Sequence, residues 1–222
     1  MAPPDETSKV AVATAEQCPQ WADIASNPVQ AAFLAMIASI TGARKVLEIG
    51  TFTGHATLAL ASALPPGGTI TTIDNFAADE TARSIALAAF ESSSHRDKIR
   101  LLEMDALTAL DAAGTGYDLI FIDADKPNYI SYFEKIIGAG ILAPGGVLLA
   151  DNTLWGGKVL HPDADSHDLG TGVDPDQWVD NLLSEWAPHV IEFNDHVNND
   201  PRVDNVMLTI HDGMTLIRRA SN

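Results

Sequence analysis

The chain has 222 residues, enough for one domain with a substantial core and short for two. Hydrophobic residues make up 46% and charged residues 19%, proportions typical of a folded globular protein and not of a disordered one. The formal net charge of −17 disfavours nucleic acid and anionic membranes as partners, because both are themselves negatively charged.

Covalent and targeting features are few. One cysteine, Cys18, excludes an internal disulfide and a zinc site built from paired thiolates. The first ten residues lack the basic and apolar regions of a secretory signal, and no apolar run approaches the roughly 18 residues that a membrane helix requires. We therefore expect a soluble, cytoplasmic protein.

The predicted elements begin with a helical segment over residues 1–43. Apolar residues at spacings of three and four predict an amphipathic helix over residues 26–40, with Pro28 in its first turn and Gly42 at its end. The apolar residues of this pattern are Val29, Phe33, Met36, Ile37 and Ile40.

From residue 45 onward, short strands alternate with helices. Strands are predicted over residues 45–50, 69–74, 99–104, 117–123 and 146–150. The helices between them are predicted over residues 55–64, 78–92, 106–113 and 128–137. This alternation indicates right-handed βαβ units and a doubly wound, mostly parallel sheet of the α/β class.

The carboxyl-terminal part departs from this alternation. Strand-like runs over residues 203–210 and 214–218 flank Asp212-Gly213, a hairpin signal, so the sheet is expected to end in an antiparallel hairpin. Residues 160–176 are rich in Asp, Gly, Pro and His and form a long acidic loop, which is usually functional or disordered. No repeat or linker divides the chain, so residues 1–222 are predicted to form a single domain.

Acidic or amide side chains stand at the end of every predicted parallel strand. Ligands of open parallel sheets bind at these carboxyl ends. The residues are Glu48, Asp74, Asp105, Asp123 and the pair Asp151-Asn152. Each alone could be a helix N-cap or a loop residue, but five in succession favour a shared site.

The turn after the first strand predicts the cofactor. Glu48-x-Gly50-x-x-x-Gly54 gives a tight turn that allows close approach to the backbone, but it lacks the spacing of dinucleotide folds. Glu48 would repel a phosphate and suits a positively charged ligand, whereas Asp74 is placed to bind ribose hydroxyls. A cofactor with a ribose, no phosphate and a positive centre is S-adenosylmethionine.

A second group of side chains predicts a metal site. If the fourth and fifth strands are neighbours, Asp123, Asp151 and Asn152 converge on one point, since adjacent strands lie roughly 5 Å apart. Three oxygen ligands without His or Cys suit a hard cation, Mg²⁺ first, with Mn²⁺ or Ca²⁺ also accepted. The alternative is a solvated acidic patch stabilised by Lys126.

Four motifs carry a resemblance to a known family. The segments GTFTGH, IDADKPNY, DNTLWGGKV and DPRVDNVMLTIHDGMTLIRR resemble the cation-dependent O-methyltransferases that include catechol and caffeoyl-CoA methyltransferases. The resemblance covers roughly residues 26–220. It implies a seven-stranded class I methyltransferase fold, which is Rossmann-like, and a homodimer.

The resemblance also assigns residues. It places Glu48, Gly50, Thr51, Asp74 and Ala106 at the cofactor and Asp125 near its methionine end. Asp105, at the end of the third strand and next to Ala106, is also predicted to bind the cofactor. The resemblance gives the same three metal ligands. The family often has Gly-Tyr-Ser where this chain has Gly54-His55-Ala56, so a serine contact to the cofactor must be replaced or lost.

The expected reaction is transfer of the sulfonium methyl group to one hydroxyl of a vicinal pair. A divalent metal would orient that pair and acidify the bound hydroxyl. Lys126, three residues after Asp123, is the candidate general base, since a nearby cation and partial burial favour the neutral amine; a salt bridge to Asp123 or Asp125 is the alternative. Trp155 could flank a flat substrate or could be ordinary packing.

Several alternatives remain at this stage. The overall acidity favours a small catechol-like phenol over a CoA thioester, whose phosphates need clustered cations, although a caffeoyl-CoA-type methyltransferase stays an alternative. A nicotinamide dehydrogenase is disfavoured by Glu48, and a two-metal hydrolase would leave Glu48 and Asp74 unexplained. A non-catalytic S-adenosylmethionine-binding module predicts binding without turnover.

Overall fold

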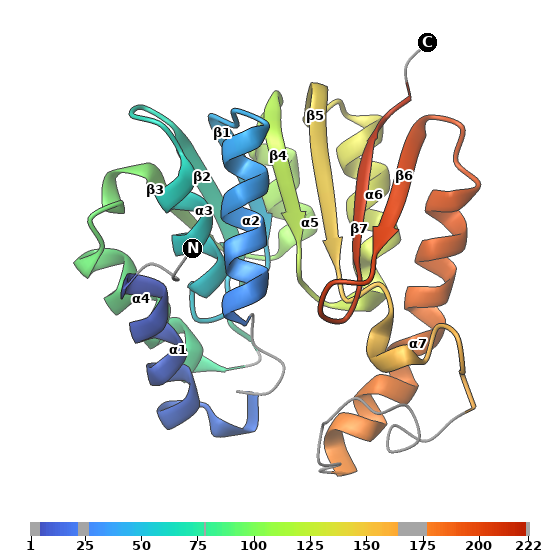
Figure 1. Ribbon diagram of the computed structural model, residues 1–222, viewed down its shortest axis with the longest axis horizontal. Helices are drawn as coiled ribbons and strands as arrows, with labels where there is room; N and C mark the ends of the chain where they lie inside the picture. Colours follow the sequence, from blue (N-terminus) through green and yellow to red (C-terminus); the bar gives the residue numbers. More distant parts are fainter. Residues whose placement is uncertain (1–4, 22–26, 78, 164–176, 221–222) are drawn as a thin grey trace.

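A seven-stranded sheet forms the centre of the molecule (Figure 1). The computed structural model describes residues 5–21, 27–77, 79–163 and 177–220. The strands are β1 (Lys45–Ile49), β2 (Thr69–Asp74), β3 (Ile99–Glu103), β4 (Tyr117–Ile122), β5 (Leu142–Asp151), β6 (Val203–Leu208) and β7 (Met214–Arg219). Their order is β3-β2-β1-β4-β5-β7-β6. The first five are parallel, and β7 runs antiparallel to both β5 and β6. The predicted fold class is confirmed.

Helices cover both faces of the sheet. They are α1 (Asp5–Gln17), α2 (Pro28–Ile40), α3 (His55–Ala63), α4 (Glu80–Ser92), α5 (Ala106–Ala112), α6 (Tyr129–Gly138) and α7 (Gln177–Asn198). Single 3₁₀ turns are η1 (Pro19–Trp21), η2 (Arg96–Lys98), η3 (Lys126–Asn128) and η4 (Trp155–Gly157). In Figure 1, α2 lies in front of the sheet and α5 and α6 lie behind it. Within the described residues, no helix is both long and apolar enough to cross a membrane.

The core explains why the strands are apolar throughout. Alternate residues of a strand point to opposite faces, and both faces are covered here. On β1, Val46 packs with Leu34 of α2 and Leu60 of α3, whereas Leu47 belongs to the cluster under α5, α6 and α7. On β4, Phe121 joins the first of these clusters and Ile120 the second.

Helix α2 has the predicted position, and part of the predicted apolar pattern packs on the core. Its N-cap is Asn27, and Pro28 stands in the first turn as expected. The buried side chains are Gln30, Ala31, Leu34 and Ala38. Val29, Met36 and Ile40 of the predicted apolar pattern are 68%, 49% and 69% exposed. Phe33 and Ile37 of the same pattern are partly buried and pack against the core, so the helix is amphipathic as predicted, with a buried face that extends beyond the pattern.

The larger differences from the predictions concern β5, β6 and α7. Strand β5 begins at Leu142, because a register shift between Tyr117 and Leu119 of β4 accommodates the Pro-Gly-Gly segment that sequence rules exclude from a strand. Strand β6 ends at Leu208, two residues early. Helix α7 was not predicted, and it contains Pro188. Most of the predicted loop over residues 160–176 lies outside the described residues.

Candidate functional site

The predicted site residues stand at the carboxyl edge of the parallel strands. The ends of β1 and β4 approach so closely that a Cβ atom at position 50 would overlap the carbonyl oxygen of Asp123. Gly50 also has φ +101°, a conformation that favours glycine. The turn after β1 therefore needs glycine for steric and conformational reasons, whatever ligand it binds.

Lys126 lies at the centre of the polar cluster at the ends of β4 and β5. Its side chain is 4% exposed, and its Nζ donates to Asn152 Oδ1 at 2.8 Å and to the Tyr129 hydroxyl at 2.6 Å. Nζ also lies 3.5 Å from Asp123 Oδ1. The expected convergence of Asp123 and Asn152 is observed, with the lysine ammonium between them.

Asp151 lies beside this ammonium and is 2% exposed. Its Oδ1 accepts the backbone N–H of Asn152 at 2.8 Å, and its Oδ2 accepts the side-chain amide of Gln30. Burial, and then the charge of Asp123, raise the pKa of Asp151 well above its ordinary value. Burial also raises the pKa of Asp123, although Lys126 opposes the shift.

Asp212 joins this cluster and was not assigned from the sequence. It lies in the β6–β7 turn, which pairing of β7 with β5 brings beside the end of β5 (Figure 1). Its carboxylate accepts the backbone N–H of Gly156 at 2.6 Å and the amide of Asn152 at 3.4 Å. Burial raises its pKa. The Asp-Gly turn signal and the antiparallel hairpin together could have located it.

We call Asp123, Lys126, Asp151, Asn152 and Asp212 the strand-end cluster. It contains three carboxylates and one ammonium, so its ionised form carries two unbalanced negative charges. Buried charges of one sign are costly unless a counter-charge compensates them. The donor set, all oxygen, fits a divalent hard cation.

Backbone strain gathers in the same region. Among the described residues, the non-glycine residues with positive φ all follow β1, β2 or β5 or lie in the β6–β7 turn. They are Phe52, Phe76, Asn152, Trp155 and His211. Such conformations cost of order 1–3 kcal/mol each and collect at functional sites.

Glu48, two residues before Gly50 on β1, is fully buried. Its Oε2 accepts hydrogen bonds from the hydroxyls of Thr72, at 2.6 Å, and Thr57. Its Oε1 has no hydrogen-bond partner within the described residues, and neither do the two ring nitrogens of buried His55. Burial raises the pKa of Glu48 to about 8. These atoms are candidates to contact a bound molecule, because buried polar groups are normally paired.

Asp74 shapes the turn after β1. Its Oδ2 accepts the backbone N–H groups of Thr51 and Phe52, both at 2.9 Å, and its Oδ1 accepts that of Phe76 at 2.8 Å. These hydrogen bonds give Asp74 and Thr51 a structural role in holding the turn.

Asp105 and Asp125 also make hydrogen bonds within the chain. Asp105, the residue before Ala106, is the N-cap of α5 and accepts the backbone N–H of Thr108 at 2.9 Å. This hydrogen bond lowers the pKa of Asp105. Asp125 accepts from Tyr132 and Asn128, each at 2.6 Å. The predicted cofactor contacts of these residues stay predictions.

Comparison with known proteins identifies the chain. A family model described as O-methyltransferase matches residues 6–220. The chain belongs to this family. Tapetum-specific methyltransferase 1 of Arabidopsis thaliana is 34% identical over 191 residues, which cover 84% of this chain and 74% of the relative. The caffeoyl-CoA O-methyltransferase of Stellaria longipes is 32% identical over 200 residues, which cover 87% and 76%.

Solved structures agree with this assignment. The SAH-bound methyltransferase PaMTH1 of Podospora anserina matches with a TM-score of 0.88 and 25% identity, covering 100% of this chain and 90% of that one. The O-methyltransferase of Bacillus cereus in complex with SAH matches with a TM-score of 0.77 and 26% identity, covering 98% and 91%. The protein is an S-adenosylmethionine-dependent O-methyltransferase of the caffeoyl-CoA methyltransferase-like family.

Trp155 of the methyltransferase is packed inside the protein. Only 6% of it is exposed, its Nε1 donates to the Leu183 carbonyl at 2.8 Å, and it stacks on Trp186 with ring centroids 5.9 Å apart. Lys126 Nζ lies 5.4 Å from its ring centroid. The packing alternative therefore accounts for Trp155, and its contact with substrate stays a prediction.

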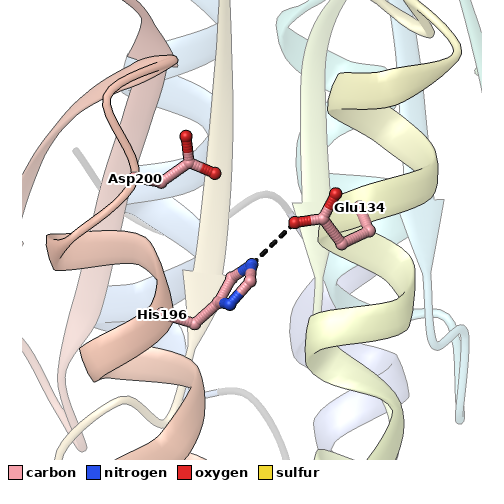
Figure 2. Close-up of side chains that lie close together, drawn as sticks. All are labelled: Glu134, His196 and Asp200. Atoms are coloured by element: carbon pink, nitrogen blue, oxygen red, sulfur yellow. Dashed lines mark hydrogen bonds and ion pairs between the residues drawn. The ribbon is translucent and has the colours of Figure 1, made fainter.

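The methyltransferase has a second group of metal-ligating side chains elsewhere. Glu134, His196 and Asp200 place ligand atoms within 4.8 Å of one another, as Figure 2 shows. His196 Nε2 lies 2.7 Å from Glu134 Oε1, and Arg202 bonds to Glu134 at 2.6 Å and to Asp200 at 2.9 Å. We call these four residues the Arg202 network. Its carboxylates already have cationic partners.

Proposed function

We propose that this methyltransferase transfers the methyl group of S-adenosylmethionine to one hydroxyl of a vicinal pair on a small catechol-like phenol, with a divalent cation held by Asp123, Asp151 and Asn152. The observation that carries the metal part of the proposal is the strand-end cluster, in which Lys126 and Asp151 are buried and the other three residues are half-buried. Its two unbalanced negative charges match a divalent cation, and its oxygen donors suit Mg²⁺ first, with Mn²⁺ and Ca²⁺ as alternatives.

The cofactor is proposed to bind beside Gly50. The unpartnered Glu48 Oε1 and the glycine turn support this placement. Asp74 would accept ribose hydroxyls with the oxygen lone pairs that its backbone bonds leave free, since a carboxylate offers about four acceptor sites. The other residues proposed to line this part of the site are Thr51, Asp105, Ala106 and Asp125.

The catalytic roles belong to Lys126 and Asp123. A cation at the cluster would supply Lewis-acid chemistry, orienting both oxygens of the substrate and lowering the pKa of the bound hydroxyl. Lys126, whose Nζ lies between Asp123 and Asn152, is proposed to release its own proton to solvent first and then, as a neutral amine, to accept the proton of the reacting hydroxyl. The Tyr129 hydroxyl accepts a hydrogen bond from Nζ at 2.6 Å and so fixes its position. Trp155 is proposed to limit the ring thickness of the substrate.

For the substrate class there is a second candidate, a CoA thioester. Several relatives carry the name caffeoyl-CoA O-methyltransferase, which favours a CoA thioester as the second candidate. The phosphates of CoA need accessible cations, and the two lysines in the segments that carry the cluster, Lys126 and Lys158, are both buried. This observation supports the smaller phenol.

A homodimer is proposed from the exposed apolar residues of α2. Val29, Met36 and Ile40 lie on the outer side of the helix, and a second copy of the chain could cover them with the same surface. Light scattering during size-exclusion chromatography should give a dimer mass for the wild type and a monomer mass for Met36→Glu. A monomeric wild type would contradict this proposal. A cytoplasmic location stays part of the proposal.

The test of function is methyl transfer from S-adenosylmethionine to a panel of catechols and caffeoyl-CoA, with Mg²⁺ and then with excess EDTA. We expect catechol methylation that EDTA abolishes. Activity that survives EDTA would contradict the cation site, and activity confined to caffeoyl-CoA would contradict the substrate class. Cofactor binding without any product would favour the non-catalytic module.

A further inference from the structure

Gln30 is a polar side chain on the buried face of α2, where its neighbours Ala31 and Leu34 are apolar. It is 1% exposed. Burying an amide without a partner destabilises a protein, so a chain that keeps a glutamine here must give it a specific partner. The Asn27 cap accepts the backbone N–H of Gln30 at 2.9 Å and fixes the first helical turn from which the side chain projects.

The partner is Asp151, 121 residues later in the sequence. The amide nitrogen of Gln30 donates to Oδ2, while Oδ1 accepts the backbone N–H of Asn152. Two donors on different oxygens fix the rotation of the carboxylate about its Cβ–Cγ bond. Lys126 directs its hydrogen bonds to Asn152 and Tyr129, so Gln30 supplies Asp151 with a neutral donor in place of a cation.

A neutral donor has a particular consequence at a cation site. A lysine or arginine on Asp151 would compensate its charge and compete with a bound cation, as Arg202 does for Glu134 and Asp200. An amide donor orients the carboxylate and leaves its charge available. Hydrogen-bond partners of metal-ligating carboxylates typically contribute 10–100-fold to metal affinity or activity.

We propose that Gln30 is a positioning residue that holds Asp151 in the orientation needed to bind the divalent cation. This inference rests on the proposed function, because it assumes that Asp151 is a cation ligand. It also assigns the first turn of α2 to the site, although α2 lies far from β5 in the sequence.

The experiment measures binding of Mn²⁺ alone to the full chain saturated with SAH, by electron paramagnetic resonance of free Mn²⁺. Gln30→Met keeps the side-chain length and removes the donor. We expect its Mn²⁺ dissociation constant to rise by about 10-fold or more, while the SAH dissociation constant changes by less than about twofold. Leu34→Met, a volume-conserving change on the same buried face, is the control and should bind both ligands like the wild type.

Two further variants keep the outcomes separate. Asp151→Asn should abolish the Mn²⁺ site; if it binds Mn²⁺ like the wild type, the proposed cation site fails, and the role of Gln30 fails with it. If Asp151→Asn loses Mn²⁺ but Gln30→Met binds it normally, the role of Gln30 alone is overturned. Should Gln30→Met not fold, Gln30→Asn retains an amide but withdraws it by one methylene, and the same loss is expected.

Discussion

The strand-end cluster and the Arg202 network are built from similar residue types with opposite electrostatics. In the first, burial raises the pKa values of Asp123, Asp151 and Asp212. In the second, hydrogen bonds from Arg202 lower the pKa values of Glu134 and Asp200. The strand-end cluster has one ammonium for three carboxylates, whereas Arg202 and His196 stand beside the two carboxylates of the Arg202 network.

The comparison separates a site from a structural contact. Paired carboxylates at the surface join α6 to the end of α7 and need no ligand. Buried carboxylates with raised pKa values destabilise the ionised protein, and such groups concentrate at functional sites. Proximity of His, Asp and Glu is therefore weak support for a cation site by itself, and the site proposed above rests on the excess of carboxylates over cations in the strand-end cluster.

The largest effect is expected for Asp151→Asn. Loss of the cation should lower kcat roughly 10³-fold, since Lewis-acid stabilisation supplies several kcal/mol. The metal-free variant should unfold at the same temperature as the wild type or a higher one, because a buried charge is removed. Steady-state kinetics and calorimetry measure both. A large loss of stability together with normal kcat would contradict the functional interpretation.

Lys126→Met should lower kcat about 10²-fold, the lower end of the range for general-base catalysis. Affinity for S-adenosylmethionine should change by less than about twofold, because the lysine contacts the strand-end cluster and not the glycine turn. Single-turnover kinetics and calorimetric titration separate the two quantities. Turnover close to that of the wild type would remove Lys126 from the mechanism.

The pH dependence of stability should have opposite signs for Glu48, whose pKa is raised, and for Glu134 and Asp200, whose pKa values are lowered. The pKa of Glu48 is raised to about 8, so its contribution to metal- and cofactor-free stability is complete below the unfolded pKa and is lost as the pH rises towards 8. The difference is on the order of several kcal/mol, since one pKa unit is about 1.36 kcal/mol. Glu48→Gln should flatten the melting temperature between pH 5 and 8. An unchanged slope in that variant would contradict the raised pKa.

The smallest effect is expected for Arg202→Met. The side chains of Arg202 and Glu134 are 43% and 40% exposed, so water screens their ion pair, whereas the Asp200 side chain is 6% exposed. The loss should be about 1 kcal/mol, or about 2–4 °C in melting temperature. Because the pKa values of Glu134 and Asp200 are lowered in the folded protein, this stabilisation is complete at pH values above their unfolded pKa values. It is lost as the pH falls through their folded pKa values. Methyl transfer should be unchanged; a tenfold loss would mean that the network serves the site.

The sequence predicted the strands and their polar ends because both depend on local patterns. Continuous apolar runs predicted that β1 and β4 are strands covered by helices on both faces. An acidic residue at the end of each run, Glu48 and Asp123, indicated the carboxyl edge of the sheet. Asp212 was missed because its own segment predicts only a turn. Gln30 was missed because it is not part of the apolar pattern of α2, and its role depends on a contact with Asp151, 121 residues later in the sequence.

By itself the sequence determined the class of sheet, the glycine turn after β1 and the polar strand ends that carry Asp123, Asp151 and Asn152, since backbone propensity and residue chemistry act over a few neighbouring positions. Only the tertiary structure decided which donors carry compensating charge. The Lys126 ammonium, the Gln30 amide and the Asp212 carboxylate reach the cluster from η3, α2 and the β6–β7 turn. Burial and electrostatics depend on distances in space, and the packing of these elements sets those distances.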